Sequence, residues 1–222
     1  MLFSKPTPKG TGIEIWGDYN DLRVLREIIL RTSPSSSQEN NPAVFERNDR
    51  LMSIIPYEIR HAYQGNRYSD NCIINGEGET TYYGFRINWI TLLYSIAVLR
   101  HNAAHQPTDE LTQGLIYILE HLTRKSMYIY DEVGAKQLEP FIGSLIYVDS
   151  NYTYLLHRYL ATKFFSQKPG KKRFRSIPSM LLDVHVTSPT YHQLIQSLKE
   201  EAEKLNCATT DLDFDDDNNI IW

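Results

Sequence analysis

Apolar residues recur every three or four positions along most of this chain, and that spacing predicts amphipathic helices. The clearest stripe follows Asp109, where leucines and isoleucines line one helical face. Helices are predicted over residues 22–29, 44–62, 89–104, 109–126, 135–147, 150–166 and 189–205. Because each predicted helix has an apolar face, we expect all of them to pack around one core.

Two shorter segments, residues 12–16 and 82–87, alternate between apolar and polar side chains, which is typical of β-strands. The last residues, 219–222, are apolar again after a run of aspartates. We expect them either to add a strand beside Ile13–Trp16 or to dock on the core. The predicted fold class is α+β and mainly helical, with helices around one core. A small β-sheet is expected from the N-terminal strand, residues 80–88 and, in the first alternative, the C-terminus.

Polar and proline-containing segments separate these elements and indicate loops. Loops are expected at residues 1–11 (an extended arm), 33–42, 66–80 and 168–175. Pro56 lacks a backbone N–H and clashes with the preceding turn, so we expect a kink or break within helix 44–62. We predict a single mainly helical domain over residues 1–210 and an acidic tail with an apolar end over residues 211–222.

The composition is that of a globular protein, with 222 residues of which 41% are hydrophobic and 23% charged. The two cysteines, Cys72 and Cys207, form neither a disulfide framework nor a metal-binding spacing. The N-terminus lacks the apolar core of a signal peptide. The longest nearly apolar run, Trp89–Leu99, is shorter than the about 20 residues that span a bilayer. We therefore expect a cytoplasmic protein with no membrane contact and no cofactor.

Charge is unevenly distributed along a chain whose formal net charge is −4. Five aspartates crowd residues 211–217, and a basic run occupies the predicted loop 168–175. This run could contact nucleic-acid phosphates, with Phe174 stacking on a base. The candidate nucleic-acid residues are Lys171, Lys172, Arg173 and Arg175. The alternative is that the basic run is an ordinary solvated loop. The acidic tail either covers the basic run or is itself a solvated end.

The stretch RHNAAH, Arg100–His105, combines residue types that can cleave RNA without a metal. Such cleavage needs a proton shuttle that titrates near neutral pH, which histidine supplies. It also needs a cation to offset the charge that develops on the phosphoryl oxygens, which arginine supplies. The stretch resembles the signature of the HEPN ribonucleases, in which an arginine and a polar residue are followed by three residues and a histidine. The resemblance implies His105 as the acid or base, Arg100 as the phosphate clamp, His101 as a polar helper and a homodimeric site.

Helix geometry sets a condition on the ribonuclease hypothesis. Residues five apart lie about 140° apart around an α-helix, so Arg100 and His105 converge if the helix ends or bends between them. Pro107 disfavours helical geometry in the residue before it, which allows such an ending. In the alternative, Arg100 and His101 lie at a helix end, where positive charge favours the carbonyl groups, and His105 lies in a loop.

Glu58 and His61 have the i, i+3 spacing of ligands in helical di-metal sites. Such a site needs a second Glu-x-x-His and two more carboxylates, and the chain contains no second copy. His101 and His105 could share a metal if one helix continued through both. We predict no metal site, and we interpret Glu58, Arg60 and His61 as a hydrogen-bonded cluster.

Three segments, GTGIEIWGDYNDL, YEIRHAYQG and YYGFRINW, are similar to an uncharacterised bacterial family of unknown function. This resemblance carries no activity, but it implies that certain polar and aromatic residues form one cluster. They are Trp16, Asp18, Glu58, Arg60, His61, Tyr63 and Arg86. The cluster is either a polar network between the sheet and the long helix or a binding pocket. The sequence therefore identifies no catalytic activity, and its function stays unknown. We expect a protein that acts through contacts with a protein partner or ligand. The alternative is a HEPN-like, metal-independent ribonuclease that binds RNA.

Overall fold

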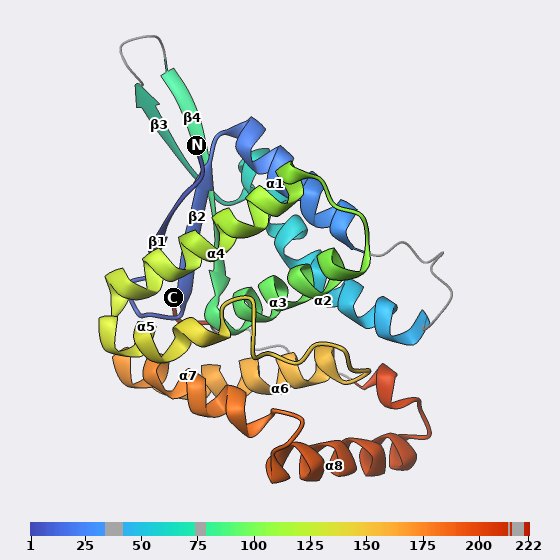
Figure 1. The fold of residues 1–222 in the computed structure, drawn as a ribbon. Helices are drawn as coiled ribbons and strands as arrows, with labels where there is room; N and C mark the ends of the chain where they lie inside the picture. Colours follow the sequence, from blue (N-terminus) through green and yellow to red (C-terminus); the bar gives the residue numbers. More distant parts are fainter. Residues whose placement is uncertain (34–41, 74–78, 213, 215–219) are drawn as a thin grey trace.

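Figure 1 shows the computed structural model of the chain, in which helices lie beside a small upright sheet and below it. The structure describes residues 1–33, 42–73, 79–212, 214 and 220–222, with the backbone only for residues 42–49, 72–73 and 210. The strands are β1 (Phe3–Pro6), β2 (Gly12–Gly17), β3 (Tyr68–Ile73) and β4 (Glu79–Asn88). The helices are α1 (Tyr19–Thr32), α2 (Pro42–His61), α3 (Trp89–His105), α4 (Glu110–Tyr130), α5 (Glu132–Leu138), α6 (Thr153–Phe165), α7 (Lys171–Asp183) and α8 (Pro189–Leu205). A π-helical turn, Ala62–Asn66, follows α2, and 3-10 turns lie at Glu139–Phe141 and Thr209–Asp211.

The four strands form one antiparallel sheet in the order β1-β2-β4-β3. The register places Glu14 of β2 opposite Lys5 of β1 on one side and Arg86 of β4 on the other. Trp16 lies opposite Gly84, and a Cβ atom at Gly84 would come within 2.5 Å of the indole ring. Glycine at this position therefore makes room for a buried aromatic side chain on the neighbouring strand.

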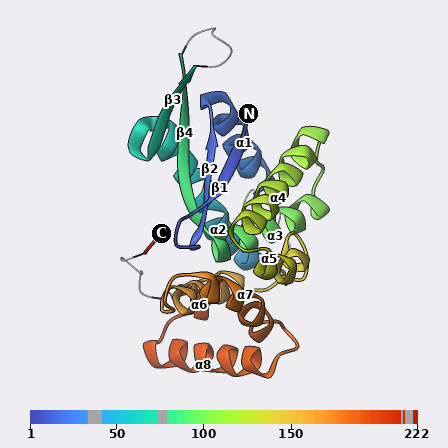
Figure 2. The ribbon, with the colours of Figure 1, turned by 90° about the vertical axis from the view of Figure 1, so that its left-hand side faces the viewer.

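The central helix of the fold is α3, in which every residue from Trp89 to Leu99 is buried. This complete burial explains why α3 is apolar on all sides rather than striped. In Figure 2 the sheet stands beside α1, while α4 forms one outer side of the molecule and α6, α7 and α8 lie below. One continuous cluster of buried residues extends from Ile13 to Leu212.

Side chains at the helix starts satisfy backbone N–H groups that have no partner within the helix. Asp18 opens α1 in a reciprocal capping box. At the start of α3, Asn88 accepts a hydrogen bond from the Thr91 backbone N–H at 2.9 Å. At the start of α4, Asp109 accepts one from the Thr112 backbone N–H. These caps fix where β2 and β4 end and where the following helices begin.

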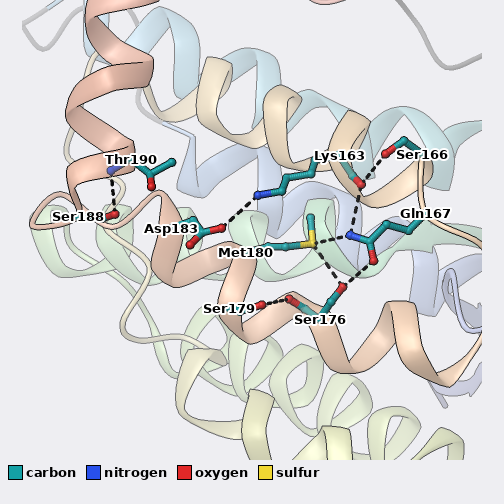
Figure 3. Close-up of polar contacts among 9 residues, drawn as sticks. All are labelled: Lys163, Ser166, Gln167, Ser176, Ser179, Met180, Asp183, Ser188 and Thr190. Atoms are coloured by element: carbon teal, nitrogen blue, oxygen red, sulfur yellow. Dashed lines mark hydrogen bonds and ion pairs between the residues drawn. The ribbon is translucent and has the colours of Figure 1, made fainter.

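Polar contacts fasten α7 to α6 (Figure 3). Lys163 Nζ lies 3.1 Å from Asp183 Oδ2, which joins the end of α6 to the end of α7. Ser176 Oγ donates to Gln167 Oε1 at 2.9 Å, and Gln167 Nε2 lies 3.4 Å from Met180 Sδ. The second half of α7 is thereby held against the end of α6 and the residues that follow it.

The predicted fold class is confirmed: the protein is mainly helical α+β, with a small antiparallel sheet built from the N-terminal strands and residues 79–88. Six of the predicted helices are present, as α1–α4, α6 and α8. The predicted arm at residues 1–11 contains β1, which is anchored where Ser4 Oγ donates to the Leu122 carbonyl at 3.0 Å. Apart from its first and last residues, the predicted loop 33–42 lies outside the described residues.

The prediction of a loop over residues 66–80 is wrong at residues 68–73 and 79–80, where β3 pairs with β4, and residues 74–78 lie outside the described residues. As an edge strand, β3 exposes residues 68–71 to solvent, so it lacks the apolar alternation that identifies a half-buried strand. The predicted helix over residues 135–147 is wrong beyond Leu138. There Gly143 and Leu145 have φ angles of 72° and 56°, which a right-handed helix excludes.

Three further predictions need correction. Of the kink or break expected at Pro56, the break is absent, because α2 is continuous to His61 and packs its apolar face on the core. The predicted basic loop is wrong from Lys171 onward, since α7 begins there. The C-terminus adds no strand beside β2, whose two edges are taken by β1 and β4. The docking alternative describes it better, because Thr11 Oγ1 donates a hydrogen bond to the Ile221 carbonyl.

Candidate binding site

The candidate ribonuclease residues lie on the last turns of α3, which continues through His105 instead of ending before it. Arg100, His101 and His105 nevertheless line one open hollow of about 470 Å³, together with Asp149. The helix does not end between Arg100 and His105, and the alternative that places His105 in a loop is wrong, yet the side chains of Arg100 and His105 border the same space.

The charge of Arg100 is already engaged. Its Nε donates to Glu120 Oε1 at 2.5 Å, and its guanidinium lies 4.3 Å from the centre of the Tyr117 ring. The hydrogen bond that Arg100 donates to Glu120 raises the pKa of Arg100. An arginine paired in this way has less positive charge to offer a phosphate.

The two histidines of this hollow are in contact, with ring centres 4.4 Å apart. His105 Nδ1 lies 2.8 Å from the His101 carbonyl oxygen. Because a carbonyl only accepts, Nδ1 must carry the hydrogen, and a neutral ring then presents a lone pair on Nε2. Burial and the nearby charge of His105 lower the pKa of His101.

The predicted nucleic-acid residues do not form one open patch. Arg173 is only 2% exposed, with its guanidinium 4.4 Å from the centre of the Phe164 ring. Arg175 and Lys171 both pair with Asp131, and the hydrogen bond from Arg175 is the main reason that the pKa of Asp131 is lowered to about 2. Lys172 is exposed.

Phe174 is completely buried, so the prediction that it stacks on a base is wrong. It packs 5.4 Å from Trp89 and 5.3 Å from Tyr130, measured between ring centres. The aromatic residue within this basic run therefore belongs to the core.

Several members of the predicted polar cluster have separate local roles. Asp18 caps α1. Tyr63 packs edge-on against Tyr19, with ring centres 5.3 Å apart. Arg60 and His61 both lie against the exposed ring of Tyr57, at 5.5 Å and 4.3 Å. These residues lie around the start of α1 and the end of α2 and do not share one pocket.

Two other cluster members, Trp16 and Arg86, are connected through Glu14, a β2 carboxylate that is only 5% exposed. Arg86 Nη2 and Nε donate to Glu14 Oε1 at 2.8 Å and 3.0 Å. On the opposite side, Lys5 Nζ lies 3.0 Å from Oε2, and Trp16 Nε1 donates to the same oxygen at 3.3 Å. Burial alone would raise the pKa of Glu14, but the hydrogen bonds from Arg86, Lys5 and Trp16 outweigh it, so the net pKa is lowered.

A pocket of about 330 Å³ lies between the sheet and helices α2 and α3, and we call it the sheet–helix pocket. Its lining is Ile54, Glu58, Arg67, Tyr68, Arg86, Ile87, Asn88, Thr91, Ile220 and Trp222. Arg67 pairs with Glu58 through two hydrogen bonds of 2.7 Å and 3.0 Å. The pocket therefore brings together Glu58 and Arg86, as the cluster prediction required. Each of these charges is offset by another residue: Arg67 pairs with Glu58, and Glu14 pairs with Arg86.

The C-terminal residues form one wall of the sheet–helix pocket. The guanidinium of Arg86 lies between two aromatic rings, 4.6 Å from the centre of Tyr68 and 5.9 Å from the centre of Trp222. Ile220 also lines the pocket, and the Ile221 carbonyl accepts from Thr11 at the turn between β1 and β2. Figure 2 shows the C-terminus beside that turn.

A chain of hydrogen bonds connects the pocket to the interior. Asn88 Nδ2 donates to Thr91 Oγ1 at 2.9 Å, and Thr91 Oγ1 lies 2.8 Å from His157 Nε2. The Thr91 hydroxyl therefore joins the Asn88 amide to the His157 ring. His157 is 2% exposed, and burial lowers its pKa to about 3, so it remains neutral.

The pocket offers an arginine face, amide and hydroxyl groups and apolar walls, which suit binding rather than bond cleavage. Within the described part of the chain, no three histidine, cysteine or acidic side chains are placed to hold a metal ion. Among the same residues, no helix is both long and apolar enough to cross a membrane.

Sequence reasoning missed several residues that build this site, notably Glu14, Arg67, Tyr68, Asn88 and Trp222. Glu14 occupies the polar position of an alternating strand, which normally faces solvent. The one available signal for a buried Glu14 was the pair of basic residues Lys5 and Arg86. They indicate a buried ion pair only once the strand register is known to place both opposite Glu14.

The chain belongs to a family defined by a domain of unknown function, DUF6904, whose model matches residues 2–222. The expectation of an uncharacterised family is confirmed by this match, which spans nearly the whole chain. No curated protein and no solved structure matches the chain. The function must therefore be argued from the site itself.

The buried His157 predicts a specific acid sensitivity. Below pH 6.5 the unfolded chain binds a proton that the folded state refuses down to about pH 3, so stability falls as the pH falls through this window. His157→Gln removes the titrating group and keeps an acceptor for Thr91. Between pH 7 and pH 5 the free energy of unfolding, measured with urea, should fall by about 2 kcal/mol more in the wild type than in the variant. The same exchange at exposed His192 should retain the wild-type dependence, and equal pH dependence in wild type and His157→Gln would contradict the assignment.

Proposed function

We propose that the protein is a non-catalytic binding protein that recognises a short apolar and aromatic peptide segment at the sheet–helix pocket. The observation that carries this proposal is that the chain's own residues 220–222 lie along the pocket. A surface that holds one such segment has the contacts needed to hold another of the same character.

Three kinds of contact support peptide recognition. Thr11 donates to a backbone carbonyl, which any peptide presents. Arg86 offers its charged face to an aromatic ring, a cation–π contact that strengthens when water is excluded. Ile54 and Ile87 supply apolar walls for a branched side chain. Together these contacts favour an aromatic residue that follows aliphatic ones.

Competition is a consequence of this arrangement. A segment attached to the same chain has an effective concentration of the order of mM for a short linker, so a partner segment must exchange with residues 220–222. The proposal retains the division into a domain of residues 1–210 and a tail of residues 211–222. A cytoplasmic location, a bacterial origin and a protein partner are also part of the proposal, on the sequence grounds given above.

The test uses a fluorescein-labelled peptide with the sequence of residues 216–222 and an amidated C-terminus, titrated with the full-length chain. Trp222→Ala weakens the competing segment, so this variant should bind the peptide at least about tenfold more tightly than the wild type in fluorescence anisotropy. Adding Arg86→Gln to Trp222→Ala should abolish binding. The matched control, Arg60→Gln in the same background, alters an exposed arginine outside the pocket and should leave binding unchanged.

Two results would refute peptide recognition at the pocket: no binding to the Trp222→Ala chain, or binding that is insensitive to Arg86→Gln while circular dichroism shows an intact fold. Amidation of the peptide ensures that the result does not depend on a terminal carboxylate.

The second candidate is the metal-independent ribonuclease. The observation that favours it is that Arg100, His101 and His105 line one hollow, with His105 Nε2 available to accept a proton. It ranks second because Glu120 offsets the charge of Arg100, which reduces the stabilisation that arginine can give to a developing phosphoryl charge.

This candidate predicts cleavage of single-stranded RNA in the presence of EDTA, followed on denaturing gels. His105→Ala should lower the rate at least about 100-fold, because a general acid or base contributes at least that much. His185→Ala serves as a control for contaminating nuclease, since this histidine lies outside the hollow. Equal cleavage by wild type and His105→Ala, or none by either, would dismiss the ribonuclease hypothesis.

A further inference from the structure

The outer face of α4 carries an apolar stripe that the fold only partly covers. Leu111, Leu115, Ile118 and Leu122 repeat at intervals of four, three and four residues, which is the spacing of a helix-pairing seam. Leu115 and Leu122 are nearly buried, whereas Leu111 is 55% and Ile118 41% exposed. Leu111 and Ile118 therefore add two exposed aliphatic side chains, two helical turns apart, to one face of α4, and such an apolar surface can contact another molecule.

The stripe borders a groove of about 640 Å³ between α1 and α4. Phe3 closes one side and Val24 of α1 contributes to the opposite wall. In both Figure 1 and Figure 2, α4 lies on the outside of the molecule. A second helix could therefore lie along α4 without displacing any described element.

The charges on α4 indicate which helix fits. Exposed Glu110 lies at the start of α4, while exposed His121 and Lys125 lie toward its end. A parallel copy would place like charges side by side, whereas an antiparallel copy places the acidic end beside the basic end. The antiparallel arrangement also aligns the helix dipoles favourably.

We infer that α4 is the contact surface of a homodimer in which the α4 helices of two copies pack antiparallel, each in the groove between α1 and α4 of the other. The two-fold axis passes near Ile118. From there Glu110 is about 12 Å along the helix in one direction and Lys125 about 10.5 Å in the other, at 1.5 Å per residue. Glu110 of each copy therefore lies level with Lys125 of the second copy. The interface is isologous, because the same residues contribute from both sides.

This inference is independent of the proposed peptide recognition, since the α4 groove and the sheet–helix pocket share no lining residue. The dimer brings together two copies of an apolar surface that is otherwise in water. In the dimer, Glu110 at the start of α4 in each copy lies beside Lys125 near the end of α4 in the other copy.

The test is sedimentation velocity of the full-length chain over a range of concentrations. The wild type is expected to sediment as a dimer that dissociates on dilution. Ile118→Lys places two like charges at the axis and should weaken the dimer at least about 100-fold. Leu111→Lys, a second exposed position, should also weaken it. Leu182→Lys, at an exposed leucine on α7, is the control and should sediment as the wild type does.

A charge exchange tests the antiparallel register. Glu110→Lys and Lys125→Glu should each weaken the dimer several-fold, and the double variant should restore it, because each new lysine again faces a glutamate. A wild type that remains monomeric at every concentration would overturn the inference. So would Ile118→Lys with an unchanged dimer, or a double variant no better than the single ones.

Discussion

The fold and its pocket both depend on one buried carboxylate. Glu14 lies in the middle of the sheet at 5% exposure, where an unpaired negative charge would be costly. The strand register solves this by placing Lys5 and Arg86 directly opposite it on the two neighbouring strands. The carboxylate therefore joins β1, β2 and β4 through side chains as well as through backbone hydrogen bonds, and a shift of either register by one residue would break that contact.

The same carboxylate also orders the surface at which we propose peptide binding. Since Glu14 holds two nitrogens of Arg86, the guanidinium plane is fixed and its face is presented to Tyr68 and Trp222. Arg67 is held in the same way by Glu58. Side chains fixed before binding lose less entropy when a partner arrives, which favours recognition. The α4 surface differs, because its contribution to dimer formation depends on exposed aliphatic groups rather than on ordered charges.

Helical periodicity predicted most helices because the burial of one face determines both the pattern and the fold, as in α4. Helical periodicity failed as a predictor where a segment does not bury one regular apolar face. The edge strand β3 is exposed, and the basic start of α7 buries Arg173 and Phe174 within a run that reads as solvated. Glu58 and Arg86 were predicted to cluster, and they share a pocket. Glu14 and Trp222 could not be predicted, because their roles arise from strand register and from contacts between residues far apart in the chain.

The most direct test of the central role of Glu14 is a double-mutant cycle on the free energy of unfolding, with Glu14→Gln, Arg86→Gln and the double variant. Glu14→Gln leaves Arg86 half-buried without its counterion, and Arg86→Gln leaves the buried Glu14 with Lys5 as its remaining cation. Each single change therefore costs more than the loss of the interaction alone. We expect the double variant to be less destabilised than the sum of the single changes, by about 1.5 kcal/mol or more. A coupling energy near zero would show that the two charges act independently and would contradict the account.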